Sequence, residues 1–578
     1  MCIMKNLLTV LLFATTMVAS FADEGPRKLT PFRPGEVCVG GEIGQRLEVT
    51  VAKMVRQTNI EDTFVRHFRT RKVEPDEPGG FAGYGMYLDA LVKAAAHGIG
   101  GEETVTFKNR LLQEIPQLIS ADGRFSMYAS EDGNWDSHEV SYLIQALARD
   151  YQWFGNTNSL AVARRLANTF IARDMMVTIG TEVAFVLMAE LTGENSYWRF
   201  LEEKCRMDDD IEAYNRTSHH LGTRHVYTWL ARAHGQLCYY GLIQRMDAAT
   251  NSARYTAAAD EALARTRGPH FSISGSMTGA PGWGELWDAT QAGIGKWGET
   301  CASAYLMRLC AKMTELRGDA RCGDVFERVM YNAFFSAQSP DGLKYRYWTP
   351  FNETPDWFDR DTFCCPNNYK REIFEIPDNV FYRSADGLVV NLFAPAVLTS
   401  KAFRARIVTD YPIDGRVTLD VTMPKDAKML WIRVPAWCGQ VTINGQSAHR
   451  GWHRVTGDFS GGRCIEVKME MPVRVIKGER AQEGRVAILR GPCVYALNAE
   501  ANKFKGGVCE GYDLDMRKPL IWDATTNAVV VTLVSPGPNP APCTARLTRY
   551  CDPERSRTYF DPIAVHDVEA DELKNPSK

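Results

Sequence analysis

Hydrophobic positions recur at three- and four-residue spacing through residues 40–335, which predicts a series of amphipathic helices. The clearest runs cover residues 137–156, 180–194, 223–243 and 300–319. Three of the runs end in a glycine that suits a left-handed C-cap, namely Gly155, Gly193 and Gly318, and a second amphipathic stretch follows each one. The pattern predicts stacked helical hairpins, but periodicity alone does not decide between an open solenoid and a closed ring.

From about residue 375 the pattern changes to short β-branched runs that are separated by turn signals such as "ADG" and "NGQ". Runs of this kind, for example "KMLWIRVPAW" (428–437), are typical of an antiparallel β-sandwich. Helices followed by strands, without alternation, indicate separate domains. We therefore expect a helical domain over residues 30–385 and a β-sandwich region over residues 386–578, with a frayed polar tail from residue 567.

The composition fits a multidomain globular protein. The chain has 578 residues, of which 45% are hydrophobic and 24% are charged. The formal net charge is −3 and no long block of like charges occurs, so we expect no nucleic-acid partner. Oligomeric state is not readable from the sequence.

The N-terminal residues read as a secretion signal. Lys5 precedes an apolar run over residues 7–19, and "SFA" (20–22) supplies a small-x-small cleavage site. We expect a signal peptide over residues 1–22, a secreted or periplasmic location, and no membrane association after cleavage. All but one of the 15 cysteines follow that site; Cys509, Cys543 and Cys551 could pair, but nothing in the sequence shows that they do.

Candidate chemistry appears in "RDTFCCPNNY" (360–369), where Cys364 and Cys365 are adjacent and Pro366 follows. Neighbouring cysteines rarely bond to each other, because the short loop strains the disulfide. Pro366 is expected to keep Cys365 out of the helical region, because a proline ring crowds the residue before it.

Glu299 and Cys301 offer two more potential metal ligands. Residues two apart do not share a helix face, so both can serve one site only where a helix begins, and "TCAS" fits such a start. Together with Cys364 and Cys365 they would form a four-ligand zinc site. The alternative is a set of buried inert thiols beside an exposed glutamate.

Three further polar residues are candidates for the reaction or for sugar binding. Glu285 lies between Trp283 and Trp287, and a carboxyl group among aromatic side chains can stay protonated and act as a general acid. The alternatives are a surface glutamate for Glu285 and caps or core partners for His138 and His225.

Several of these stretches, taken in order, resemble glycoside hydrolase family 127, the β-L-arabinofuranosidases, and the related family 146. The resemblance rests on "GGEIGQRLEV" (40–49), "HEVSYLIQAL" (138–147), "WGETCASAYLMRL" (297–309), "FCCPNN" (363–368), "IRVPAW" (432–437) and "GRVAILRGPCVYAL" (484–497). It implies an (α/α)6 barrel followed by β-sandwich modules.

The resemblance also implies roles for the candidate residues. Cys364 would be the nucleophile, and Cys365 would bind zinc together with Glu299 and Cys301. Glu285 would be the acid/base of a double displacement with retention, with Asp288 as the next candidate. His138 and His225 match sugar-binding positions, and we assign Trp283 and Trp287 to the same pocket.

The expected substrate is an oligosaccharide or glycan that carries a β-L-arabinofuranosyl or related sugar. Two departures suggest an altered pocket: "PNN" follows the second cysteine where the family has "PPN", and residues 177–183 hold no histidine where the family places one. Two other functions stay open: a different (α/α)6 carbohydrate enzyme, such as an unsaturated-uronyl hydrolase or a lyase, and a non-catalytic carbohydrate-binding protein.

Overall fold

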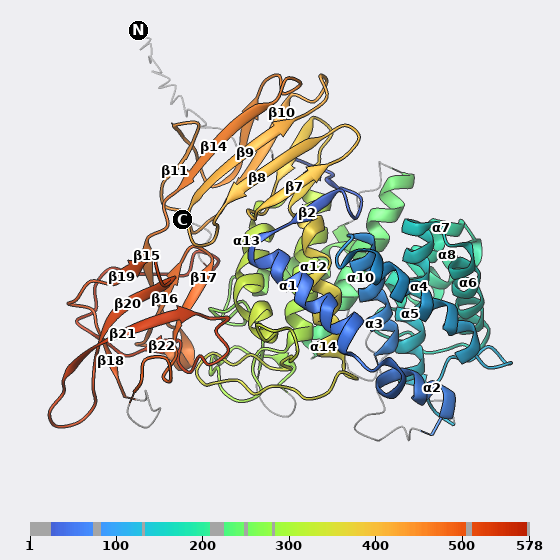
Figure 1. The fold of residues 1–578 in the computed structure, drawn as a ribbon, viewed down its shortest axis with the longest axis horizontal. Coiled ribbons are helices and arrows are strands. Elements are labelled where there is room, and N and C mark those ends of the chain that lie inside the picture. The colour runs from blue at the N-terminus through green and yellow to red at the C-terminus, as the bar shows by residue number, and fades with distance from the viewer. Residues whose placement is uncertain are drawn as a thin grey trace, which may run out of the picture.

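A computed structural model describes residues 25–72, 83–129, 133–207, 225–247, 253–279, 284–504 and 511–574. Figure 1 shows a helical domain, coloured blue to yellow-green, beside a β region in orange and red. The helical domain therefore precedes the β region, as the hydrophobic pattern predicts. The expected signal peptide (1–22), Trp283 and Cys509 lie outside the described residues.

Helices of the first domain pack as neighbours around a closed circle. The circle runs through α3 (Tyr84–Ala96), α5 (Gly133–Phe154), α7 (Thr181–Thr192), α10 (Val226–Met246), α12 (Thr300–Arg317) and α14 (Cys364–Ile373), and α14 contacts α3. Further helices flank the circle: α1 (Gly41–Ala52), α2 (Arg66–Thr70), α4 (Gly101–Leu118), α6 (Thr157–Ala172), α8 (Asn195–Arg199), α11 (Ala257–Arg265) and α13 (Ala320–Val329). The hairpins therefore form a closed ring, which periodicity had left undecided.

The ring helices are buried on nearly every side, whereas α4 and α6 bury one face each. That difference follows from their positions, because a ring helix has protein both inside and outside it. The three hairpin glycines adopt positive φ, and Gly193 and Gly318 are the C-caps of α7 and α12. The left-handed caps expected from the sequence are confirmed at these helix ends.

Two sheets form the first part of the β region. One has the order β1-β5-β6-β10-β13 and the other the order β12-β11-β14-β9-β8-β7-β2. Their strands are β1 (Thr30–Pro31), β2 (Val37–Val39), β5 (Phe381–Arg383), β6 (Gly387–Val390), β7 (Ala396–Thr399), β8 (Arg404–Thr409), β9 (Arg416–Thr422), β10 (Met429–Val434), β11 (Val441–Ile443), β12 (Gln446–Ser447), β13 (Gly451–Thr456) and β14 (Arg463–Met469). Strands such as β8 and β14 alternate buried and exposed residues, as expected when one face covers a core.

A ten-stranded sheet forms the remainder of the β region, shown in red in Figure 1. Its strands are β15 (Val473–Lys477), β16 (Val486–Arg490), β17 (Cys493–Leu497), β18 (Asp513–Asp515), β19 (Ile521–Asp523), β20 (Ala528–Val534), β21 (Pro542–Arg549), β22 (Tyr559–Phe560), β23 (Pro562–Ile563) and β24 (Val568–Glu569). A small hairpin inside the helical domain, β3 (Thr278–Gly279) and β4 (Leu286–Trp287), carries part of the candidate site.

The two ends of the described chain differ from the domain boundaries that the sequence predicts. Strands β1 and β2 pair with β5 and β7, so residues 30–39 belong to the β region and not to the helical domain. The expected frayed tail is wrong for residues 567–574, because β24 pairs in parallel with β15 and Leu573 is buried. The pairing partners of both segments lie more than 90 residues away along the chain, which local sequence patterns do not reveal.

Within the described ranges, no helix combines the length and the apolar character needed to cross a bilayer.

Candidate active site

Two helix starts meet at the cysteine pair. Helix α12 begins at Thr300, directly after its N-cap residue Glu299, and α14 begins at Cys364 and packs against α12. Cys301 and Cys365 are each the second residue of a helix, where backbone N–H groups and the positive end of the helix dipole favour a thiolate. The predicted helix start at "TCAS" is confirmed.

Pro366 does not act as the sequence suggested. Cys365 lies inside the first turn of α14 and is followed by Pro366 as the third helical residue. The N–H groups of a first helical turn have no partner within the helix, so a proline there costs no hydrogen bond. Pro366 therefore permits the helix that holds Cys365, and the expected non-helical conformation is wrong.

The predicted metal ligands come together. Ligand atoms of Glu299, Cys301, Cys364 and Cys365 all lie within 4.8 Å of one another. The Cys365 Sγ lies 3.2 Å from the Cys301 Sγ and 3.9 Å from Glu299 Oε1. Glu299, Cys301 and Cys365 are fully buried, whereas Cys364 is partly exposed.

This donor set fits a soft divalent cation. Burial raises the pKa of the Glu299 carboxyl and of the Cys301 and Cys365 thiols well above their usual values, so these groups are costly to ionise alone. A dication would supply the missing positive charge. Among the described residues, buried Glu299 Oε2 has no hydrogen-bond partner, which leaves an oxygen available as a ligand. Three thiols with one carboxylate suit Zn²⁺.

Glu285 lies beside the cluster, and one ligand atom from each of Glu285, His225 and Glu299 lies within 4.8 Å of the others. Glu285 Oε2 is 2.8 Å from His225 Nε2, and the Tyr347 hydroxyl donates to Glu285 Oε1. The same hydroxyl is 3.7 Å from the Cys364 Sγ. Tyr347 therefore joins a carboxyl group to a thiol across the site, although no sequence motif singled it out.

Local backbone structure explains the position of Glu285. It directly precedes β4, and its carbonyl accepts a hydrogen bond of 3.0 Å from the Val226 N–H at the start of α10. His225 is the N-cap residue of α10, so the same connection places His225 and Glu285 side by side.

The four thiol and carboxyl groups of the cluster are not equivalent. Hydrogen bonds from the Cys301 and Cys365 thiols, and next the nearby Tyr347 hydroxyl, hold the pKa of Cys364 well below its usual value. Cys364 is thus the thiol of the cluster that ionises most readily, and it is also the one that solvent can reach.

The remaining predicted site residues that the structure describes pack against other parts of the helical domain. His138 is buried and its ring centroid lies 4.7 Å from that of Tyr142. Trp287 contacts Trp229 edge-on and lies under the Arg265 guanidinium. Asp288, the alternative acid/base, is buried and accepts a hydrogen bond from the Thr290 N–H.

Comparisons with known proteins agree on one family. A family model described as the β-L-arabinofuranosidase GH127 catalytic domain matches residues 87–378, and the model of the GH127 middle domain matches residues 387–471. A non-reducing end β-L-arabinofuranosidase of Bifidobacterium longum subsp. longum is 27% identical over 238 residues. That match spans 36% of this chain and only 36% of the relative.

Solved structures show the same fold. A GH127 β-arabinofuranosidase superposes with a TM-score of 0.77 at 18% identity, over 93% of this chain and 98% of that one. A GH127 β-L-arabinofuranosidase from Geobacillus stearothermophilus T6 gives a TM-score of 0.73 at 20% identity, over 91% of this chain and 100% of that one.

Proposed function

Because the chain belongs to glycoside hydrolase family 127, we propose that it releases a β-L-arabinofuranosyl residue from the non-reducing end of an oligosaccharide or glycan. The observation that carries the proposal is the convergence of Cys364 and Glu285 on the Tyr347 hydroxyl. A nucleophile and a proton donor within one small site are what a retaining glycosidase requires.

The reaction would proceed in two displacements. In the first, the Cys364 sulfur attacks the anomeric carbon and a C–S bond forms as the glycosidic C–O bond breaks. Glu285 passes its proton to the leaving oxygen. In the second, the Glu285 carboxylate takes a proton from water, which attacks the same carbon, and the electron pair of the C–S bond returns to sulfur. Two inversions at one carbon give net retention.

Surroundings decide which thiol acts as the nucleophile. Cys301 and Cys365 are fully buried, whereas Cys364 is partly exposed and faces Tyr347. The pKa of Cys364 is held well below its usual value, first by the hydrogen bond from Cys301, so its sulfur forms the thiolate more readily than those of Cys301 and Cys365.

We also infer that Glu299, Cys301 and Cys365 hold Zn²⁺, with Cys364 completing the donor set. A bound zinc ion supplies positive charge that keeps the thiols ionised. The fit rests on the four donors and on the unpartnered Glu299 Oε2.

Two further proposals concern architecture and location. The closed circle of α3, α5, α7, α10, α12 and α14, flanked by other helices, supports an (α/α)6 barrel. The apolar run within residues 1–22 supports export to the periplasm or beyond.

A panel of aryl glycosides tests the function. We expect hydrolysis of the β-L-arabinofuranoside with retention, followed by NMR of the first-formed anomer, and loss of activity when zinc is chelated. A haloacetamide derivative of L-arabinofuranose should add one mass adduct on Cys364, and the C364S variant is the matched control. Cleavage of an unsaturated uronyl substrate in place of the furanoside, or an inverted product, would contradict the proposal.

A further inference from the structure

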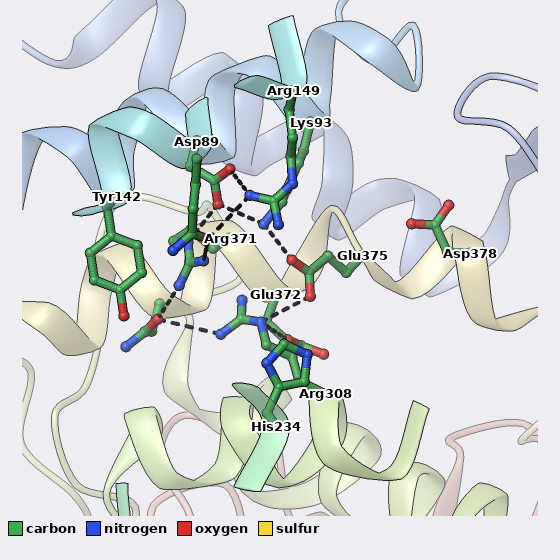
Figure 2. Close-up of polar contacts among 12 residues, drawn as sticks. Asp89, Lys93, Tyr142, Arg149, His234, Arg308, Arg371, Glu372, Glu375 and Asp378 are labelled. Carbon is green, nitrogen blue, oxygen red and sulfur yellow. Dashed lines mark hydrogen bonds and ion pairs between the residues drawn. The ribbon is translucent and has the colours of Figure 1, made fainter. Parts of the chain in front are cut away.

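A network of buried charges joins four helices of the ring, α3, α5, α12 and α14, beside the thiol cluster. Figure 2 shows side chains from opposite sides of the ring meeting there, with Arg371 and Glu375 between Asp89 above and Arg308 below. The charged members are Asp89 and Lys93 of α3, Arg149 of α5, Arg308 of α12, Arg371 and Glu372 of α14, and Glu375.

These charges are paired with good geometry. Asp89 is fully buried and accepts hydrogen bonds of 2.7 Å from both Lys93 Nζ and Arg371 Nε. Arg308 Nε lies 2.9 Å from Glu375 Oε2 and 3.1 Å from Glu372 Oε2. Buried ion pairs of this kind fix side-chain positions, because breaking one leaves an uncompensated charge inside the protein.

Asn368 connects this network to the thiols. Its Oδ1 accepts hydrogen bonds from Arg371 Nη1 at 3.0 Å and from Arg308 Nη1 at 3.4 Å. Its Nδ2 donates to the Cys301 Sγ at 3.1 Å. Asn368 is itself fully buried in α14.

The orientation of the Asn368 amide is dictated by its neighbours. A guanidinium group has only donors, so the amide oxygen must face Arg371 and Arg308. The amide NH2 group is thereby left to point at sulfur. A hydrogen bond to a metal-binding sulfur orients that ligand, and two cations beside the amide oxygen strengthen the N–H donor.

We propose that Asn368 is a positioning residue of the metal centre, which fixes the Cys301 thiolate by an N–H···S hydrogen bond while Arg371 and Arg308 hold the amide in place. The inference rests on the metal site of the proposed function. In this proposal the buried charges hold the Asn368 amide against the Cys301 sulfur, and they thereby raise the affinity for the metal.

Metal affinity of two variants tests the inference without reference to turnover. In N368A the donor is lost, and in N368D a carboxylate replaces the donor beside the thiolate. We expect zinc affinity, measured by competition with a chromophoric chelator, to fall by roughly 10–100-fold in N368A and further in N368D. The sulfur-to-metal charge-transfer absorption of the Co²⁺-loaded protein should shift in both variants.

The matched control is N332A. Asn332 is another fully buried amide, whose Nδ2 donates to the Arg328 and Pro492 carbonyls and not to a thiol. Its loss should lower thermal stability while leaving zinc affinity and the cobalt spectrum unchanged.

The outcomes distinguish the role of Asn368 from the existence of the metal site. Wild-type affinity and spectrum in N368A, within about twofold, would overturn the inference and leave the proposed function standing. An equal loss of affinity in N332A would also overturn it, because the effect would then be general destabilisation. A wild-type protein that binds no zinc would overturn both the metal site and the role of Asn368.

Discussion

At the scale of single residues, the two adjacent cysteines differ in their neighbours, and their neighbours change their chemistry. Cys365 is fully buried and faces Cys301 and Glu299, whereas Cys364 is partly exposed and faces the Tyr347 hydroxyl. One helix start can therefore supply a structural ligand and a reactive group from consecutive positions.

Serine substitution should separate these two thiols. We expect C364S to lose turnover by roughly 10³-fold or more while it keeps most of the zinc, because a neutral hydroxyl is a much poorer nucleophile than a thiolate. C365S should lose zinc first and activity as a consequence. Elemental analysis alongside kinetics checks both, and full activity in zinc-replete C364S would move the nucleophile elsewhere.

Glutamine at position 285 tests the proton donor. E285Q should slow turnover of a natural oligosaccharide by roughly 10²–10⁴-fold, the range of general acid–base catalysis. Aryl substrates with good leaving groups need less protonation, so their first step should suffer less. Unchanged activity on the oligosaccharide would transfer the role to Asp288.

Tyr347 offers a sharper test of the same geometry. In Y347F the Glu285 carboxyl loses the hydrogen bond that the Tyr347 hydroxyl donates, and the Cys364 thiol loses a polar neighbour at 3.7 Å. A hydrogen bond to a charged group contributes about 1.5–3 kcal/mol, so kcat/KM should fall by roughly 10–100-fold. The acid limb of the pH–rate profile should shift as well. Y345F is the control, because Tyr345 is buried and no hydrogen bond among the described residues joins its hydroxyl to Glu285 or Cys364.

The sequence pattern identified the candidate metal ligands but not the residues that form hydrogen bonds to the site, Tyr347 and Asn368. Adjacent cysteines, an "ExC" spacing, Glu285 among tryptophans and His225 are visible in the chain, and the family resemblance gave these residues their roles. Tyr347 contacts a residue 62 positions away and Asn368 one 67 positions away. Neither type of residue is rare and neither spacing is a motif, so only the fold reveals them.

At the scale of elements, the first turns of helices organise the site. The start of α12 was predictable, because Glu299 and Cys301 can share a site only there. The start of α14 was not, because the rule for residues before proline is a preference that a helix N-terminus can override. A third helix start, that of α3, is held by a carboxyl group: Glu139 of α5 accepts hydrogen bonds from the Gly83 and Gly85 N–H groups.

Glu139 should give stability a distinct pH dependence. Burial raises its pKa from 4.5 to about 7 in the folded protein. Between these values the folded state binds more protons than the unfolded state, so the free energy of unfolding falls as pH rises from about 4.5 to about 7, and then levels off. At about 1.4 kcal/mol per pKa unit, the fall is about 3 kcal/mol.

Replacing Glu139 with glutamine removes this titration. Denaturation of E139Q should show a free energy of unfolding that changes less between pH 4.5 and pH 8 than that of the wild type. The loss of the hydrogen bonds can lower the free energy of unfolding at every pH, but it does not restore this slope. E102Q, at an exposed position in the first turn of α4, should keep the wild-type slope. A wild-type slope in E139Q would show that this carboxyl is ionised equally in both states.

At the scale of the whole molecule, both ends of the described chain join the β region to the helices. The hydrophobic pattern predicted the order of the two domains because each pattern is local. It missed β1, β2 and β24, whose pairing partners lie far along the chain. The polar composition of the tail suggested fraying, yet its acidic residues are the counter-ions of buried arginines.

Glu572 is the central contact of that tail. Its carboxylate lies 2.6 Å from Arg328 Nη2 of α13 and 2.6 Å from Arg474 Nη2 of β15, so it bridges the helical domain and the last sheet. Removing one partner of a buried ion pair leaves an uncompensated charge and costs about 3–5 kcal/mol. Arg328 keeps its 3.1 Å contact with Asp571, so we expect E572A to lie near the lower end of that range.

The pH dependence of E572A provides the decisive comparison. Although burial opposes ionisation, Arg328 and Arg474 lower the pKa of Glu572 to about 2 in the folded protein, below the usual 4.5. The ion pairs therefore stabilise the fold above about pH 4.5, and this contribution is lost as pH falls towards 2. The difference in melting temperature between E572A and the wild type should be largest near neutral pH and should shrink below pH 4.

Zinc content and turnover below the melting transition should not change, because Glu572 makes no contact with the thiol cluster. E569A is the control, since Glu569 is half exposed and lies 3.9 Å from Arg474 Nε. A wild-type melting temperature for E572A at pH 7 would show that the tail does not hold the two domains together.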